Sequence, residues 1–287
     1  MRRVSNNVKT VFLLAVLGGF FVIVGAWLGG TTGATLGLTI GVAMSFGTYW
    51  FSDRLALRAA RAQPVSEQEA PWLYRIVEDL TTRAGMPMPR LYITPDAQPN
   101  AFATGRNERH AAVAVTAGIV DVLDESELRA VLAHEMAHVR NHDILIGSIA
   151  AALAMAITFA ARVMMFGAAG SRNRRANPLA LVAMMILAPL AATIVQLALS
   201  RSRESEADWS GAELIGTGIP LARALQKLER GAQVVPMDVE PARSAAYIVN
   251  PLTGRRIAFA GLFATHPPIE ERIAALFDEE RELAARR

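Results

Sequence analysis

The feature that most limits how this chain can fold is an uncharged stretch from Thr10 to Ser52. About 20 apolar residues in an α-helix span the hydrocarbon core of a bilayer, so this stretch is long enough to cross it twice. Glycine and threonine fill residues 29–33 and are typical of a turn. We therefore predict an N-terminal hairpin of two membrane helices, at 10–28 and 34–51.

A cleaved signal peptide is the alternative interpretation of the first apolar helix. Its apolar region would be long, no small-x-small cleavage site is evident, and a second apolar segment follows at once. The composition also favours a membrane protein, because 52% of the residues are hydrophobic and only 19% are charged. A net charge of +3 is too small to indicate binding to nucleic acid.

Basic residues flank the predicted hairpin at both ends, whereas its turn carries no charge. Cytoplasmic segments beside membrane helices are enriched in lysine and arginine, so we expect both ends of the hairpin in the cytoplasm. The flanking basic residues are Arg2, Arg3, Lys9, Arg54, Arg58 and Arg61.

A second apolar region contains two further stretches that are long enough to span, at 144–167 and 178–199. The loop between them is basic, which conflicts with the positive-inside rule if it lies outside the cell. We favour a transmembrane hairpin over a segment that lies shallowly in the membrane. The chain then divides into a hairpin at 1–52, a second hairpin at 144–200, and two parts of one soluble domain at 53–143 and 201–287.

The soluble parts are patterned mainly as helices with two short strands. Strands are predicted at 90–94 and 111–116, with a polar, turn-rich segment at 100–110 between them. Ser66 and Glu69 have the spacing of a capping box and predict a helix over 64–84. The predicted fold class is therefore mainly α with a small β-sheet.

A further helix is predicted to begin at Ser126, because apolar residues then recur at helical spacing. These residues are Leu128, Val131, Leu132 and Met136. Later helices are expected at 201–215, 220–231 and 267–287.

The chain contains no cysteine, so thiol nucleophiles, disulfides and cysteine-based metal sites are excluded. Any metal ion must be held by histidine, aspartate or glutamate. His134 and His138 are four residues apart on a predicted helix, so both imidazoles lie on one face and can bind one zinc ion. Glu135 points elsewhere on the helix and can take a proton from the attacking water. Two surface histidines without a metal are the less favoured alternative.

A catalytic zinc site needs a third protein ligand. His142 has drifted round the helix from His134, and Ile144 stands where a third metzincin histidine would lie. His110, His266 and the carboxylates remain as candidates. The carboxylate cluster at 203–208 is the richest, and in it Glu204 and Asp208 share a helix face while Glu206 points away. We favour Glu204 as the ligand, with Asp208 accepting a hydrogen bond from a ligand imidazole.

At these residues the chain resembles the HtpX-type membrane zinc metalloproteases, in the wider family that includes the CAAX prenyl proteases. The motifs that carry the resemblance are HEMAH at 134–138, Arg203-Glu204 with Ala207-Asp208, and Thr265-His266-Pro267. Two apolar hairpins match the family layout as well. The resemblance implies a gluzincin-like catalytic domain that faces the cytoplasm, with one zinc ion per chain and Glu204 as its third ligand.

The resemblance also suggests roles outside the ligand set. It implies that His266 stabilises the oxyanion of the tetrahedral intermediate, and that Arg272 supports His266 or binds substrate carbonyls. Asn100 and Ala101 belong to a segment that resembles the family's substrate cleft. The strand at 111–116 is expected to be the edge strand that pairs with an extended substrate.

The sequence therefore predicts a zinc-dependent endopeptidase of the bacterial inner membrane. The resemblance implies that its substrates are misfolded or damaged membrane proteins, cleaved for quality control under stress. A protease that cuts within the bilayer is the first alternative, but charged residues flank the helix of His134. A membrane scaffold without catalysis is the second, and no catalytic group of the motif is missing. The oligomeric state is left open.

Overall fold

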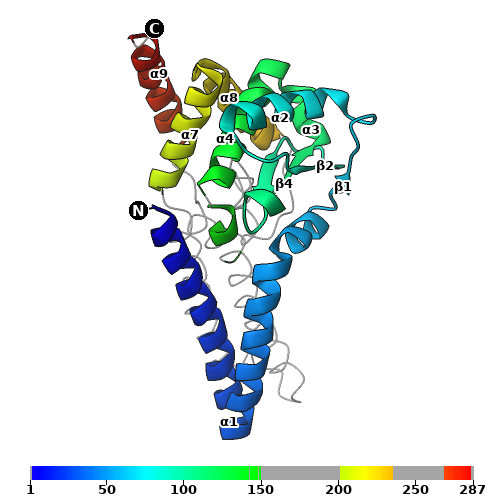
Figure 1. The fold of residues 1–287 in the computed structure, drawn as a ribbon, viewed down its shortest axis with the longest axis vertical. Coiled ribbons are helices and arrows are strands. Elements are labelled where there is room, and N and C mark those ends of the chain that lie inside the picture. Colours follow the sequence, from blue (N-terminus) through cyan, green and yellow to red (C-terminus); the bar gives the residue numbers. More distant parts are fainter. Residues whose placement is uncertain (1, 142, 148, 150–200, 235–267, 286–287) are drawn as a thin grey trace.

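The computed structural model describes residues 2–141, 143–147, 149, 201–234 and 268–285. These residues form a body of helices around a four-stranded sheet, and a long helical hairpin projects from that body (Figure 1). The predicted fold class, mainly helical with a small sheet, is confirmed. The predicted second apolar hairpin falls, apart from its first residues, outside the described part of the chain.

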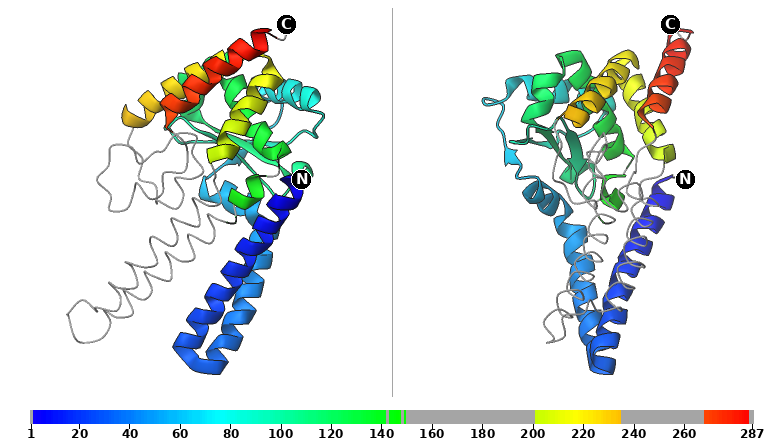
Figure 2. Two further views of the ribbon diagram at one scale, coloured as in Figure 1. Left: turned by 90° about the vertical axis from the view of Figure 1, so that its left-hand side faces the viewer. Right: turned by 180° about the vertical axis from the view of Figure 1, so that it is seen from behind.

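The hairpin is α1 (Arg2–Ala59), which consists of two helices joined by a break. The backbone of Gly29 and Gly30 is non-helical, and Gly30 has a φ of +59°. The turn therefore lies where the glycine-rich residues predicted it, because glycine adopts such a conformation without steric cost. The two arms are closest at the turn and diverge toward the body (Figures 1 and 2).

Glycines let the two arms of the hairpin touch through their backbones. A methyl group at Gly25, Gly33 or Gly37 would overlap a backbone carbonyl of the facing arm. Nearer the body, Ser45 Oγ donates a hydrogen bond of 3.2 Å to the carbonyl of Leu14 on the other arm. This is the small-residue contact that joins helices where no hydrophobic force acts between them.

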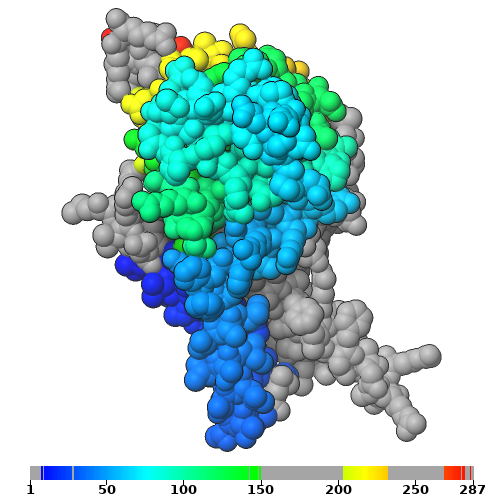
Figure 3. Space-filling model, turned by 45° about the vertical axis from the view of Figure 1, so that its right-hand side comes forward, coloured from blue at the N-terminus to red at the C-terminus, as the bar shows by residue number. Residues whose placement is uncertain are grey.

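The outer face of the hairpin is apolar, and it stands clear of the body in the space-filling view (Figure 3). Among the described residues, one helical segment, Thr10–Trp27, is long and apolar enough to cross a membrane, and 17% of it is buried. The predicted second span at 34–51 is helical too. It also carries exposed apolar side chains, including Leu36, Val42 and Phe46.

The sheet has the order β1-β2-β4-β3, with β2 and β4 parallel and the outer strands antiparallel to their neighbours. The strands are β1 (Gln63–Pro64), β2 (Arg90–Thr94), β3 (Ala101–Thr104) and β4 (Ala112–Thr116). The two predicted strands are confirmed as β2 and β4. The sequence analysis missed β3, which lies in the segment expected to be a turn, because its four residues are too few to show an alternation.

The expectation that residues 111–116 form the edge strand is wrong. β4 lies between β2 and β3, and all five of its residues are buried. Alanine and valine alternate along β4, so both of its faces are apolar. A strand with two apolar faces is typical of the centre of a sheet. β3 is the edge strand instead, and no described strand pairs with its outer side.

Helix α2 (Pro71–Ala84) begins seven residues later than predicted. Ser66 and Glu69 do interact as in a capping box, with Ser66 N and Oγ donating to the Glu69 carboxylate at 2.8 and 2.7 Å. They close a separate turn, however, because Pro64 pairs in β1 and Pro71 begins the helix. The helix ends at Gly85, whose φ is +64°.

Helix α4 (Glu125–Arg140) carries the histidine motif and begins one residue before its predicted start. Asp124 caps it, and a capping box with Glu127 fixes the first turn. The predicted apolar stripe is buried in the core. The last turns of α4 are thereby held against the body.

The 3-10 turn η1 (Glu108–His110) lies between β3 and β4, and α3 (Ala117–Val122) connects β4 to α4. In the described part of the chain, three later helices complete the body around α4. The later helices are α7 (Arg201–Ile215), α8 (Ile219–Val234) and α9 (Ile269–Ala285). Gly211 of α7 lies so close to α4 that a methyl group there would sit 3.0 Å from His134 N. On α9, Leu276 is buried, and Glu280 accepts hydrogen bonds from Thr217 Oγ1 and Gly218 N at 2.7 and 2.8 Å.

Candidate metal centre

Helices α4 and α7 bring three potential metal ligands together. The Nε2 atoms of His134 and His138 are 3.2 Å apart. The Glu204 carboxylate faces both, with its oxygens 3.8 Å from His134 Nε2 and 3.6 Å from His138 Nε2. One ligand atom from each of the three residues lies within 4.8 Å of the others. The structure thus groups the three residues that the sequence nominated as ligands.

The donor set fits a zinc ion. Two nitrogens at about 2.0–2.1 Å from a tetrahedral zinc are about 3.3–3.4 Å apart. The two Nε2 atoms already have nearly this separation. Two imidazoles with one carboxylate are a set that zinc hydrolases use, and three protein ligands leave a position for a reactant. Such a centre would be buried, because His134 and Glu204 are each only 2% exposed.

Asp208 and Arg272 stand behind His134. His134 Nδ1 lies 2.8 Å from Asp208 Oδ1, within hydrogen-bonding distance, which leaves Nε2 to face the other ligands. Arg272 donates to both oxygens of Asp208, from Nε at 2.8 Å and from Nη2 at 2.7 Å. Burial raises the pKa of Asp208, but the charge and hydrogen bonds of Arg272 outweigh it and hold that pKa below its usual range. Asp208 is therefore a carboxylate at neutral pH.

The position of Arg272 does not agree with a role in binding substrate carbonyls. Its side chain is 2% exposed, and its fork is turned toward Asp208. Its Nη1 atom lies 3.9 Å from Glu204. Its described contacts place positive charge behind the ligands, and the other role expected for it, support of His266, stays a prediction.

Asp143 stands behind His138 in the corresponding place, and the sequence analysis did not identify it. Asp143 Oδ2 lies 3.5 Å from His138 Nδ1. Burial lowers the pKa of His138, but the hydrogen bond to Asp143 and the charges of Glu204 and Glu135 outweigh burial and raise it to about 9. In the metal-free protein His138 is therefore protonated at neutral pH. The one sequence signal was an aspartate five residues after His138.

Glu135 lies beside the cluster and faces β3. Its Oε2 accepts a hydrogen bond of 2.9 Å from the backbone N–H of Ala103, and the residue is 7% exposed. The edge strand therefore fixes the carboxylate that the sequence nominated as the general base. The hydrogen bond between Ala103 and Glu135 thus joins β3 to α4.

Asn100 and Ala101 lie at the start of the edge strand, and both are buried. The backbone of Asn100 is bonded to Thr116, through N to Oγ1 at 2.8 Å and through its carbonyl to N at 2.9 Å. Ladder bonds alternate along antiparallel strands, so Ala101 and Ala103 turn their backbone groups to the outer edge.

Of the remaining histidines, His110 is the one that the structure describes, and it is not part of the cluster. His110 lies in η1, is exposed, and has Nδ1 2.8 Å from Asn107 Oδ1. His142 and His266 lie outside the described residues. The oxyanion role expected for His266 therefore stays a prediction.

Comparisons with known proteins identify a family and a related fold. The model of peptidase family M48 matches residues 67–280. A protease HtpX homolog of Pelotomaculum thermopropionicum is 50% identical over 277 residues, covering 94% of this chain and 98% of the relative. A protease HtpX homolog of Ralstonia pickettii is 49% identical over 275 residues, with coverages of 94% and 96%. The crystal structure of S. mikatae Ste24p has a similar fold, with a TM-score of 0.52 and 18% identity over 96% of this chain and 66% of that chain.

Proposed function

The chain belongs to peptidase family M48, and from this premise we propose that it is a zinc-dependent endopeptidase of a bacterial inner membrane. The observation that carries the proposal is the convergence of His134, His138 and Glu204, with Glu135 fixed beside them. The three ligand side chains would hold one zinc ion. Glu135 is left free of the ligand set and can serve in proton transfer.

We assign a separate catalytic role to each group at the centre. The ion, when bound, would lower the pKa of a water molecule toward neutrality and polarise the scissile carbonyl. Glu135 takes the proton of the attacking water and later delivers it to the leaving amine. The Ala103 N–H holds that carboxylate in place. Asp208, fixed by Arg272, keeps the proton of His134 on Nδ1, so that the Nε2 lone pair is available.

We place the substrate along β3 rather than along β4. An extended peptide can pair with the outward backbone groups of Ala101 and with the Ala103 carbonyl, next to Glu135. Asn100 and Ala101 would act through this strand and not through their side chains, because both are buried. Recognition by main-chain pairing agrees with cleavage of many sequences.

The hairpin supports a membrane location. Its exposed apolar side chains would face lipid, and its basic flanks support an orientation with both ends and the protease domain in the cytoplasm. A site beside the bilayer favours misfolded or damaged membrane proteins as substrates, in quality control under stress. A substrate screen in vesicles should return membrane proteins, and a screen that returns soluble peptides alone would count against this assignment.

The ligand assignment is tested with full-length protein purified in detergent. Zinc content and casein cleavage are measured for the wild type and for Glu204→Ala. Glu206→Ala is the matched control, because it lies on the same helix outside the cluster. Loss of zinc and cleavage in Glu204→Ala alone supports the proposal. Retention of both would overturn the ligand set.

A further inference from the structure

Both candidate histidine ligands have an aspartate behind their Nδ1 atom, and both aspartates face a buried arginine. The chain behind His134 is Asp208 and then Arg272, with contacts of 2.8 and 2.7 Å. The chain behind His138 is Asp143 and then Arg203, with distances of 3.5 and 3.7 Å. The sequence predicted the aspartate of the first chain but not its arginine, and nothing assigns the second chain a role.

Asp143 is held in this place by the end of α4. Its backbone N–H donates a hydrogen bond of 3.0 Å to the carbonyl of His138, so the chain turns back over the histidine after the helix ends. Its side chain is 8% exposed. A carboxylate that is so little exposed to water requires a compensating charge or hydrogen-bond donors nearby.

Arg203 supplies that charge. Its side chain is 9% exposed, and its Nη1 atom lies 3.7 Å from Asp143 Oδ1. Among the residues that the structure describes, the guanidinium nitrogens of Arg203 have no hydrogen-bond partner within 3.5 Å. Burial lowers the pKa of Arg203, and the charges of Asp143 and Glu204 oppose that effect. A buried guanidinium that pairs with a carboxylate behind a ligand histidine needs an explanation beyond surface solubility.

We propose that Asp143, held by Arg203, is the positioning residue of His138. It accepts the Nδ1 proton of His138, and so fixes the tautomer and the ring orientation that present Nε2 to the metal ion. The inference rests on the proposed metal centre. The centre would then contain two arginine–aspartate–histidine chains. In the first, the arginine comes from α9 and the aspartate from α7. In the second, the arginine comes from α7 and the aspartate from the turn after α4.

The two chains are not equally tight, and this sets the expected order of effects. The contacts behind His134 have the lengths of charge-assisted hydrogen bonds. Those behind His138 are longer by roughly 1 Å or less. Removal of Asp143 should therefore weaken metal binding less than removal of Asp208.

The test measures zinc affinity of full-length protein in detergent by competition with a chelator, together with the absorption spectrum of the cobalt-substituted protein. Loss of a carboxylate behind a ligand histidine typically weakens metal binding by about 10–100-fold. Asp143→Ala should fall in this range and shift the cobalt spectrum. Asp143→Asn keeps an acceptor for the Nδ1 proton and should recover part of the affinity. Arg203→Met should weaken binding in the same direction as Asp143→Ala.

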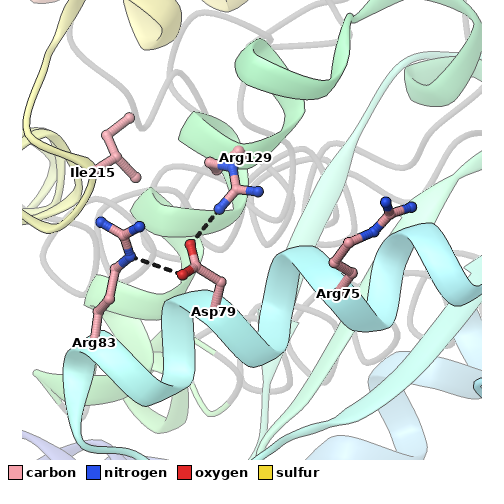
Figure 4. Close-up of a pocket in the computed structure, with 5 residues that line it drawn as sticks. All are labelled: Arg75, Asp79, Arg83, Arg129 and Ile215. Carbon is pink, nitrogen blue, oxygen red and sulfur yellow. Dashed lines mark hydrogen bonds and ion pairs between the residues drawn. The ribbon is translucent and has the colours of Figure 1, made fainter.

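Asp79 provides the matched control. It lies on α2 and pairs with Arg83, at 3.0 Å from Nε, and with Arg129 beside a surface cavity of about 430 Å³ (Figure 4). This is the same aspartate–arginine chemistry without a histidine behind it. Arg129 is nine residues before His138 on α4, roughly 14 Å along the helix axis. Asp79→Ala should leave the zinc affinity and the cobalt spectrum as in the wild type.

Three results would overturn the inference. The first is an unchanged zinc affinity and cobalt spectrum in Asp143→Ala while His138→Ala loses the metal, because the centre would then stand without this pair. The second is a loss of thermal stability in Asp143→Ala that is equal with and without zinc and leaves affinity unchanged, because the role would be structural only. The third is a wild-type protein that binds no zinc, which removes the proposed function as well.

Discussion

His134 Nδ1 and Asp208 Oδ1 lie 2.8 Å apart in a buried pocket that both residues share with Arg272. The side chains of all three are 2–3% exposed. In this buried environment each charge stabilises the other, because burying an unpaired charge lowers the stability of the fold. We therefore expect stability and metal binding to be linked at Asp208.

The first prediction separates these two effects. Asp208→Ala removes the carboxylate that accepts two hydrogen bonds from the buried Arg272 charge, and breaking a buried pair costs about 3–5 kcal/mol. The free energy of unfolding, measured with a denaturant, should fall by that order, and zinc affinity should fall with it. Asp208→Ala combined with Arg272→Met should recover much of the stability but not the affinity. Recovery of both would mean that Asp208 does not act through His134.

The second prediction concerns Glu135. Glu135→Gln removes the proton acceptor but keeps an amide oxygen for the Ala103 N–H, so the fold and the metal should be retained. Loss of a general base slows a reaction by about 10²–10⁴-fold, and kcat for casein should fall in that range while zinc content stays the same. Glu125→Gln, at the exposed start of the same helix, is the control. Cleavage by Glu135→Gln at the wild-type rate would exclude the mechanism.

The third prediction uses the pKa of His138. That pKa is raised to about 9 in the metal-free protein, above the ordinary value of 6.5. The protonated histidine therefore stabilises the metal-free fold below pH 6.5, and this contribution is lost as the pH rises toward 9. Zinc binds the neutral imidazole, so its affinity rises over the same interval.

The rise in Tm on adding zinc should consequently grow between pH 6.5 and 9. Calorimetry in buffers of different ionisation enthalpy should show release of about one proton from His138 per zinc ion near neutral pH. Metal-free His138→Gln should lack the decline in stability. A zinc-induced Tm shift that is constant over this interval would contradict the assignment of His138 as a ligand.

The fourth prediction compares two glycines on one arm of α1. An alanine at Gly37 would overlap the carbonyl of Phe21 on the facing arm, whereas nothing lies within 4 Å of a methyl group at Gly47. Overpacking costs about 1–3 kcal/mol, so Gly37→Ala should destabilise the detergent-solubilised protein. Gly47→Ala should stabilise it by about 0.5–1 kcal/mol through helix propensity. Equal effects at the two positions would show that the arms do not touch through Gly37.

Much of this fold and site could be predicted because its signals are local. The glycine turn of the hairpin, strands β2 and β4 and the capped helix α4 follow from patterns of a few residues. His134 and His138 are grouped by helix geometry alone. Glu204 and Asp208 were nominated by the same periodicity on another helix, and packing of α4 on α7 brings the two pairs together.

What the sequence could not provide are relationships that only tertiary packing creates. β3 is recognisable by its pairing with β4, and α2 starts late because Pro64 belongs to the sheet. Arg272 was expected to support His266 or to bind substrate carbonyls, and only the packing of α9 brings it onto Asp208. Asp143 and Arg203 are 60 residues apart and meet only behind His138.

The docking of α9 also has a consequence for biosynthesis. Translation produces the histidines of α4 first, then Glu204 and Asp208, and the guanidinium of Arg272 comes 134 residues after His138. A nascent chain that stops short of Arg272 holds both histidines and both carboxylates but lacks the cation that pairs with Asp208 and lies 3.9 Å from Glu204. The order of synthesis thus delays the pairing of Asp208 with Arg272 until α9 has been made.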